Sequence, residues 1–181
     1  MWTEVSSTPA ARIFSAYVPE WSWGSPEVAA KGRPSADGPG VGEETRPEFH
    51  VRIEPDLPML DLDAVLLEQV LVNLLDNASK YTPAGSAVSV GARRQAGSIV
   101  LQVQDEGPGI PEAELERIFA KFYRSRAGDR KRPGTGLGLA VCLGFVEALG
   151  GTITAGNRSD RSGAVFTLTF PERRTNQPPA A

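Results

Sequence analysis

Four polar side chains recur at helical spacing along one predicted helix. Asn73, Asn77, Lys80 and Tyr81 line an edge beside the apolar stripe of that helix. Asparagine is a poor helix former, so two asparagines inside a helix need a reason other than local stability. An amide oxygen is a hard ligand that suits Mg²⁺, and a lysine ammonium suits a phosphate. From this helix alone, a metal and phosphate site and a solvated helix face are about equally favoured.

A second candidate is the loop Asp-Glu-Gly-Pro-Gly-Ile-Pro at residues 105–111. Asp105 has the same parity as the apolar residues 99, 101 and 103, so its carboxylate should point to the buried face of a strand. An inward acid followed by Gly107 and Gly109 favours a ligand with an N–H donor and a close approach of the backbone. By itself, however, the loop slightly favours an aspartate that caps backbone amides in a turn.

The third candidate is the run Gly-Thr-Gly-Leu-Gly-Leu-Ala at residues 134–140, which opens a predicted helix. Glycines let backbone N–H groups approach an anion, and the helix N-terminus adds a favourable dipole. No Lys-Ser/Thr pair follows, which excludes a Walker A loop, and a basic loop in place of a strand precedes it, which excludes a dinucleotide fingerprint. Residues 121–132 hold six basic side chains and one acid, typical of a segment that closes over phosphates or, more commonly, of a solvated loop.

The surrounding pattern predicts the elements that position these candidates. Helices are expected from residue 61 or 63 to 81, near 112–119, and from after 134 to the glycine pair at 150–151. Strands are expected at 49–53, 88–92, 99–104, 151–155 and 164–170, with a turn at 156–163 between the last two. This order predicts an α/β fold of two layers, with helices on one face of a mixed, mainly antiparallel sheet.

Composition limits the class of protein. The 181 residues include 19 Lys+Arg and 22 Asp+Glu, and a formal net charge of −3 excludes bulk attraction to nucleic acid as the main activity. No apolar run approaches the roughly 18 residues of a membrane span, and the first residues lack the order of a signal peptide. A single cysteine, Cys142, excludes an internal disulfide. These features predict a cytoplasmic chain.

The chain is expected to divide into three parts. Residues 1–47 are rich in Gly and Pro and hold all three tryptophans. They are predicted to be a disordered, non-homologous or wrongly started segment, with a docking segment as the alternative. Residues 48–171 are predicted to form the domain, and 172–181 a polar tail.

Taken together, these candidates resemble the catalytic ATP-binding domain of sensor histidine kinases. Residues 73–81 resemble the N box, 105–109 the G1 box, 119–122 the F box and 134–138 the G2 box, in matching order and spacing. The amino-acid sequence at 108–111 and 151–158 is most similar to that of the KdpD type of potassium-responsive sensor kinase. The resemblance implies the GHKL (Bergerat) ATP-binding fold, an α/β sandwich, with ATP and Mg²⁺ as cofactors.

The resemblance also implies roles for individual residues. Asn77 would hold Mg²⁺, Asn73 and Lys80 would lie at the phosphates, and Arg124 would help to neutralise their charge. Tyr81 would meet the purine, and Asp105 would accept a hydrogen bond from the adenine amino group. Residues 123–133 would form the lid over ATP. The remaining ATP-binding residues would be Gly107, Gly109, Ile110, Gly134, Thr135, Gly136, Leu137 and Gly138.

The same resemblance suggests an incomplete kinase. Family kinases carry a phosphoacceptor histidine followed at once by an acid on a dimerising helical hairpin, whereas the only histidine here, His50, lies in a strand-like run. The leading hypothesis is therefore a histidine protein kinase module that donates the γ-phosphoryl group of ATP to a histidine on another chain. A response regulator would be its indirect partner, and neither nucleic acid nor membrane would contact this chain.

Two alternative hypotheses remain from the sequence. One is a degenerate ATP-binding regulatory module without kinase activity, which the missing histidine hairpin favours. The other is a GHKL serine kinase or ATPase. An ATPase is disfavoured because Asn73 stands where such enzymes have a glutamate, and an amide cannot take a proton from water at neutral pH. A serine kinase is disfavoured because such kinases typically lack the element at 119–122.

Overall fold

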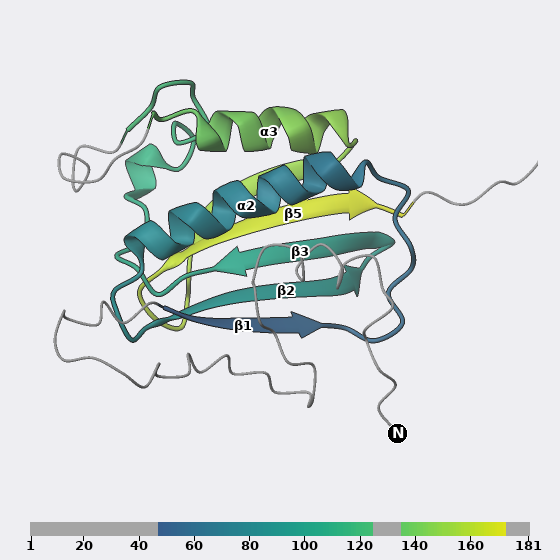
Figure 1. Ribbon diagram of the computed structural model, residues 1–181, viewed down its shortest axis with the longest axis horizontal. Coiled ribbons are helices and arrows are strands. Elements are labelled where there is room, and N and C mark those ends of the chain that lie inside the picture. Colours follow the sequence, from purple (N-terminus) through teal and green to yellow (C-terminus); the bar gives the residue numbers. More distant parts are fainter. Residues whose placement is uncertain (1–46, 125–134, 173–181) are drawn as a thin grey trace, which may run out of the picture.

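Residues 47–124 and 135–172 are described by the computed structural model, and within them five strands form one mixed sheet (Figure 1). The strand order is β1-β2-β3-β5-β4. β1 pairs with β2 in parallel, and the other neighbouring pairs are antiparallel. The predicted mixed, mainly antiparallel sheet is therefore confirmed. The strands are β1 (Glu48–Ile53), β2 (Ala87–Gln95), β3 (Ser98–Gln104), β4 (Thr152–Asn157) and β5 (Ala164–Pro171).

Two helices, α2 (Ala64–Tyr81) and α3 (Gly138–Ala148), lie side by side on one face of this sheet (Figure 1). α2 begins at Asp63, whose Oδ1 accepts hydrogen bonds from the N–H groups of Val65 (2.9 Å) and Leu66 (3.2 Å). It ends before the Thr-Pro pair at 82–83, because proline cannot continue a helix. Both ends agree with the prediction.

The remaining helices differ from the prediction in extent. α3 begins only at Gly138 because Gly136 has φ +71°, outside the helical region. It ends at Ala148, and Gly150, with φ +76°, follows the C-cap Leu149. The helix predicted near 112–119 is a single 3₁₀ turn, η2 (Glu112–Glu114), followed by hydrogen-bonded turns up to residue 119. So short a segment gains few backbone hydrogen bonds to offset the cost of helix nucleation.

The core lies between the helices and the sheet. Val70, Leu74 and Val146 are 0 % exposed and face the inner side chains of the strands. Burial of each such side chain contributes about 1.5–3 kcal/mol to folding. The inner residues of the sheet include Val88, Val90, Val103, Ile153, Phe166, Leu168 and Phe170.

The outer face of the sheet carries no helix in the described part of the chain and is polar. Gln102 and Gln104 alternate with the buried Val103 and Asp105 along β3 and its end, so the predicted parity of Asp105 is confirmed. Among the residues described, no helix is both long enough and apolar enough to cross a membrane.

The buried thiol of Cys142 gives a test of this packing. Cys142 is 0 % exposed on α3, its Sγ donates to the carbonyl of Val70 at 3.7 Å, and burial raises its pKa to about 12. Because the thiolate is the reactive form, alkylation at pH 8 should be more than about a hundredfold slower than that of a free thiol. Labelling followed by mass spectrometry measures this rate. Urea that unfolds the chain should restore the full rate, whereas fast labelling without urea would contradict the packing of α3 on α2.

Candidate functional site

The three sequence motifs meet along α2. Gly138, the first residue of α3, lies beside Asn73, since a Cβ placed on Gly138 would be 3.7 Å from Asn73 Oδ1. Eight residues further along α2, the carbonyl oxygen of Tyr81 lies close to Gly107, where a Cβ would be 2.9 Å away. These two meeting points are about 12 Å apart along the helix axis, since each residue rises about 1.5 Å. A ligand with two chemically different ends could therefore span them.

Asp105 is the buried acid of this region. It is 5 % exposed directly after β3, and its Oδ1 accepts hydrogen bonds from the N–H groups of Gly107 (2.8 Å) and Ala164 (3.1 Å). Both bonds end on Oδ1, so a donor from a ligand would be accepted by Oδ2. The turn-capping interpretation and the ligand interpretation of the loop are thus compatible, because they use different oxygens of one carboxylate.

The polar edge of α2, which carries Asn73, Asn77, Lys80 and Tyr81, also contains an ion pair that was not predicted. Lys80 Nζ donates to Asp76 Oδ2 at 2.5 Å, four residues earlier on the same helix. Both side chains are more than a third exposed, and such pairs contribute about 0.3–0.5 kcal/mol. The pair is therefore too weak to fix Lys80 against a stronger anion. The signal for it was the i, i+4 spacing of Asp76 and Lys80. Asn77 lies between them, half-buried.

The glycine-rich segment before α3 contacts the end of the F box. The carbonyl oxygen of Gly136 accepts a hydrogen bond from the N–H of Phe122 at 3.0 Å. A Cβ on Gly136 would be 2.8 Å from the carbonyl oxygen of Tyr123, so this close approach and the positive φ both require glycine. Gly134 and the predicted lid residues 125–133 lie outside the described residues.

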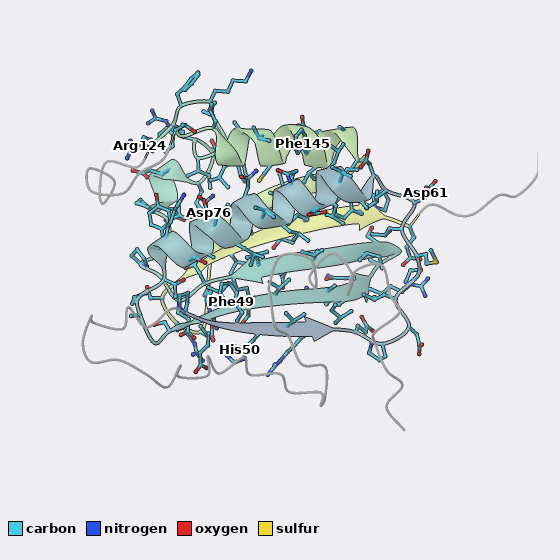
Figure 2. All side chains as sticks on the ribbon, viewed as in Figure 1. Phe49, His50, Asp61, Asp76, Arg124 and Phe145 are labelled. Atoms are coloured by element: carbon cyan, nitrogen blue, oxygen red, sulfur yellow. The ribbon has the colours of Figure 1, made fainter. Side chains whose placement is uncertain are left out.

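The start of α3 presents backbone N–H donors. Leu137 precedes the helix and makes no capping hydrogen bond with its side chain. The N–H groups of the first turn, which begins at Gly138, therefore have no partner within the helix and are suited to an anion. Thr135 lies exposed just before them, and Figure 2 shows Arg124 at the same end of the sandwich, beyond the start of α3.

The end of β4 and the turn that follows it contribute residues to the site that were not predicted from the sequence. The side-chain amide of Asn157 accepts a hydrogen bond from the N–H of Ile110 and donates one to its carbonyl oxygen, both at 2.7 Å. Ser162 Oγ donates to the carbonyl oxygen of Gly107 at 2.7 Å. The sequence predicted only a turn at 156–163, and its single further signal was the glycine at 163.

Glu106 joins the same loop to its surroundings through charge. Its Oε2 accepts from the N–H of Ala87 at 3.0 Å, and its Oε1 accepts from Arg161 at 2.8 Å. The Ala87 amide, then Arg161 and Arg158, hold the pKa of Glu106 below its usual value although burial opposes them. Glu106 is thus an anion at neutral pH, directed away from Asp105 and bonded to two other elements.

A cavity of about 470 Å³ lies on the outer face of the sheet, where Gln102, Gln104, Thr154 and Thr167 line it. None of the predicted site residues lines this cavity. The convergence of the three motifs on α2, and not the size of a cavity, therefore identifies the candidate site.

Comparison with known proteins agrees with this geometry. Residues 62–174 match the family described as histidine kinase-, DNA gyrase B-, and HSP90-like ATPase. The chain is 42 % identical over 127 residues to the sensor protein KdpD of Clostridium acetobutylicum, which is 69 % of this chain and 14 % of that protein. The chain thus spans about one-seventh of the length of that relative.

Solved structures of histidine kinases share the fold. The mycobacterial sensor histidine kinase MprB superposes with a TM-score of 0.56 at 29 % identity, over 68 % of this chain and 80 % of MprB. Full-length ShkA in complex with AMPPNP superposes with a TM-score of 0.55 at 30 % identity, over 68 % of this chain and 25 % of ShkA. The expected GHKL fold and the resemblance to sensor histidine kinases are confirmed, and the chain belongs to the family of histidine kinase-, DNA gyrase B- and HSP90-like ATPases.

Proposed function

We propose that this chain is the ATP-binding catalytic part of a two-component sensor histidine kinase. It would donate the γ-phosphoryl group of ATP to a histidine of a separate dimerisation domain. One observation carries the proposal. In a member of this family, Asn73 meets Gly138 at one point of α2, and at another Gly107 lies against both Tyr81 and Asp105.

The purine would bind at the Asp105 end. A buried carboxylate whose Oδ1 is already bonded to two backbone N–H groups is held in a fixed orientation. Its Oδ2 would accept the N–H of the adenine amino group, while Tyr81 and the loop of Gly107, Gly109 and Ile110 would enclose the base. Guanine has a carbonyl oxygen at the corresponding position, which a carboxylate would repel. This arrangement therefore supports a preference for adenine.

The phosphates would bind at the Asn73 end. The N–H groups at the start of α3 and the backbone of residues 135–138 would bind phosphate oxygens, and the amide of Asn73 would lie beside them. Lys80 and Arg124 would neutralise charge during transfer, with Lys80 leaving its weak pair with Asp76. Asn73 cannot act as a base toward water, so hydrolysis of ATP should be slow.

The oxygen donors at the Asn73 end of the site suit Mg²⁺. Asn77 offers an amide oxygen one turn after Asn73, and within the residues that the structure describes no group of three or more His, Cys, Asp or Glu could hold a metal alone. Asn77 would therefore bind the ion together with phosphate oxygens and water, the usual arrangement for Mg²⁺. When bound, Mg²⁺ would supply charge neutralisation on the phosphates.

The phosphoacceptor would have to come from outside the site. His50 lies on the edge strand β1 and pairs in register with Ser89, on the opposite face from Phe49, which packs against the core. It therefore faces away from α2 and the residues around it. We infer that the folded unit, residues 48–171, acts on a histidine hairpin of another chain or segment, with a response regulator as the next partner.

The purine assignment is tested by Asp105→Asn. The substitution keeps an acceptor for Gly107 and Ala164 but removes the charged acceptor for the adenine amino group. ATP binding should weaken by about 1.5–3 kcal/mol, the range for a hydrogen bond to a charged group, and GTP binding should weaken less. Isothermal titration calorimetry measures both. Gln104→Ala, on the outer face of the same strand, serves as the control, and unchanged ATP affinity in Asp105→Asn would refute the purine site.

The metal assignment is tested by Asn77→Ala. The variant should lose most of the dependence of ATP affinity on Mg²⁺ while its thermal unfolding stays close to that of the wild type, because Asn77 is only half-buried and lies beside the apolar stripe. Titrations with Mg²⁺ and with EDTA measure the dependence. Ser79→Ala, exposed on the same helix, is the control. An unfolded variant, together with a wild type that shows no Mg²⁺ effect, would make Asn77 structural.

The transfer reaction is tested with γ-labelled ATP. The 181-residue chain alone should not become labelled, whereas an added dimerising hairpin with an acceptor histidine should acquire acid-labile label. Lys80→Ala should reduce this transfer by more than about tenfold. Label on the isolated chain that is lost in His50→Ala would make His50 the acceptor. ATP binding without transfer to any hairpin would favour a binding-only module.

A further inference from the structure

We propose that Asn157 is a positioning residue for the purine loop, defined here as residues 105–111. The side-chain amide of Asn157 would hold Gly109 and Ile110 at the distance from the base that binding requires. Asn157 is nevertheless far from this loop in the sequence. The inference rests on the proposed function, because it assigns to Asn157 a part in selecting adenine at that same site.

The contact between Asn157 and the loop uses both groups of one amide. Its Oδ1 accepts from the N–H of Ile110 and its Nδ2 donates to the carbonyl oxygen of Ile110, each at 2.7 Å. Two bonds from one planar group fix orientation as well as distance. Gly109 has φ +79°, and a Cβ there would be 2.8 Å from Asn157 Oδ1. The loop thus approaches Asn157 as closely as only a glycine allows.

Further contacts join the end of the β4–β5 turn and the start of β5 to the loop. Ser162 Oγ donates to the carbonyl oxygen of Gly107 at 2.7 Å, and the N–H of Ala164 donates to Asp105 Oδ1 at 3.1 Å. A Cβ on Gly163 would overlap the carbonyl oxygen of Asp105, so the two backbones are in close contact at this point. The turn therefore contacts the loop near its start, at its centre and near its end.

The loop needs this support because it has little regular structure of its own. Residues 105–111 contain no strand or helix residues, and loops without such ladders sample several conformations. A binding site for a planar base tolerates deviations of only about 0.5 Å in the groups that contact it. Asn157 supplies to Ile110 the paired hydrogen bonds that a neighbouring strand would supply in a sheet. Loss of Asn157 should therefore weaken recognition of the base more than binding of the phosphates.

The experiment compares Asn157→Ala, Asn157→Asp and the control Ser159→Ala in the full chain. Ser159 is exposed in the same turn and makes none of the contacts described above. Calorimetry gives the affinities for ATP and GTP, thermal unfolding gives stability, and hydrogen exchange by NMR follows the amide of Ile110.

The expected results separate positioning from simple stabilisation. Asn157→Ala should lower ATP affinity about tenfold, reduce the preference for ATP over GTP, and leave the melting temperature near that of Ser159→Ala. The Ile110 amide should exchange fastest in Asn157→Ala and at an intermediate rate in Asn157→Asp, because aspartate retains the acceptor and loses the donor.

Three results would overturn the inference, and they are distinguishable. Faster exchange at Ile110 with unchanged ATP affinity and base preference would show a contact without a role in binding. Equal losses for ATP and GTP that accompany a lower melting temperature would show a structural role only. A wild-type chain that binds neither nucleotide would refute the proposed function itself, and the inference with it.

Discussion

The buried carboxylate of Asp105 is the group on which most of the site depends. A buried charge is costly unless hydrogen bonds compensate it, and Asp105 obtains them from two backbone N–H groups that belong to different segments. One is Gly107, in the loop that follows β3, and the other is Ala164, the first residue of β5. The same two bonds that make burial possible therefore also hold the loop, the strand and the acid in one arrangement.

The candidate site combines side chains on a regular helix with backbone groups from irregular segments. α2 packs four buried residues into the core, so the polar edge of the helix has a fixed position relative to the sheet. The irregular segments, residues 105–111 and 135–137, provide backbone groups at either end of that edge. Each irregular segment is attached to something else, the first to the β4–β5 turn and the second to the end of the F box. The positions of these two irregular segments thus depend on contacts with residues outside the sequence motifs.

Local patterns predicted the elements and motifs well because their causes are local. The alternation of apolar and polar residues predicted the strands and the inward direction of Asp105. The helical spacing of apolar residues, followed by a proline, predicted α2. The delayed start of α3 and the single turn of η2 were not predicted, because a positive φ at Gly136 and the cost of nucleating a short helix leave no clear mark in residue spacing. Asn157 and Ile110 are 47 residues apart. Such a pairing arises from the order of strands, and a single sequence carries no direct signal for it.

The thiol of Cys142 has a consequence for the end of the site where Asn73 and Gly138 meet. It lies fully buried on α3, and its Sγ donates to the carbonyl oxygen of Val70 on α2. Its side chain therefore fills part of the space between the helices, one turn after Gly138, which lies beside Asn73. A bulkier residue would widen that gap, because packed interiors accommodate an added methylene only by shifting the backbone. The distance between Asn73 and Gly138 would in this way depend on a core residue that is not among the predicted site residues.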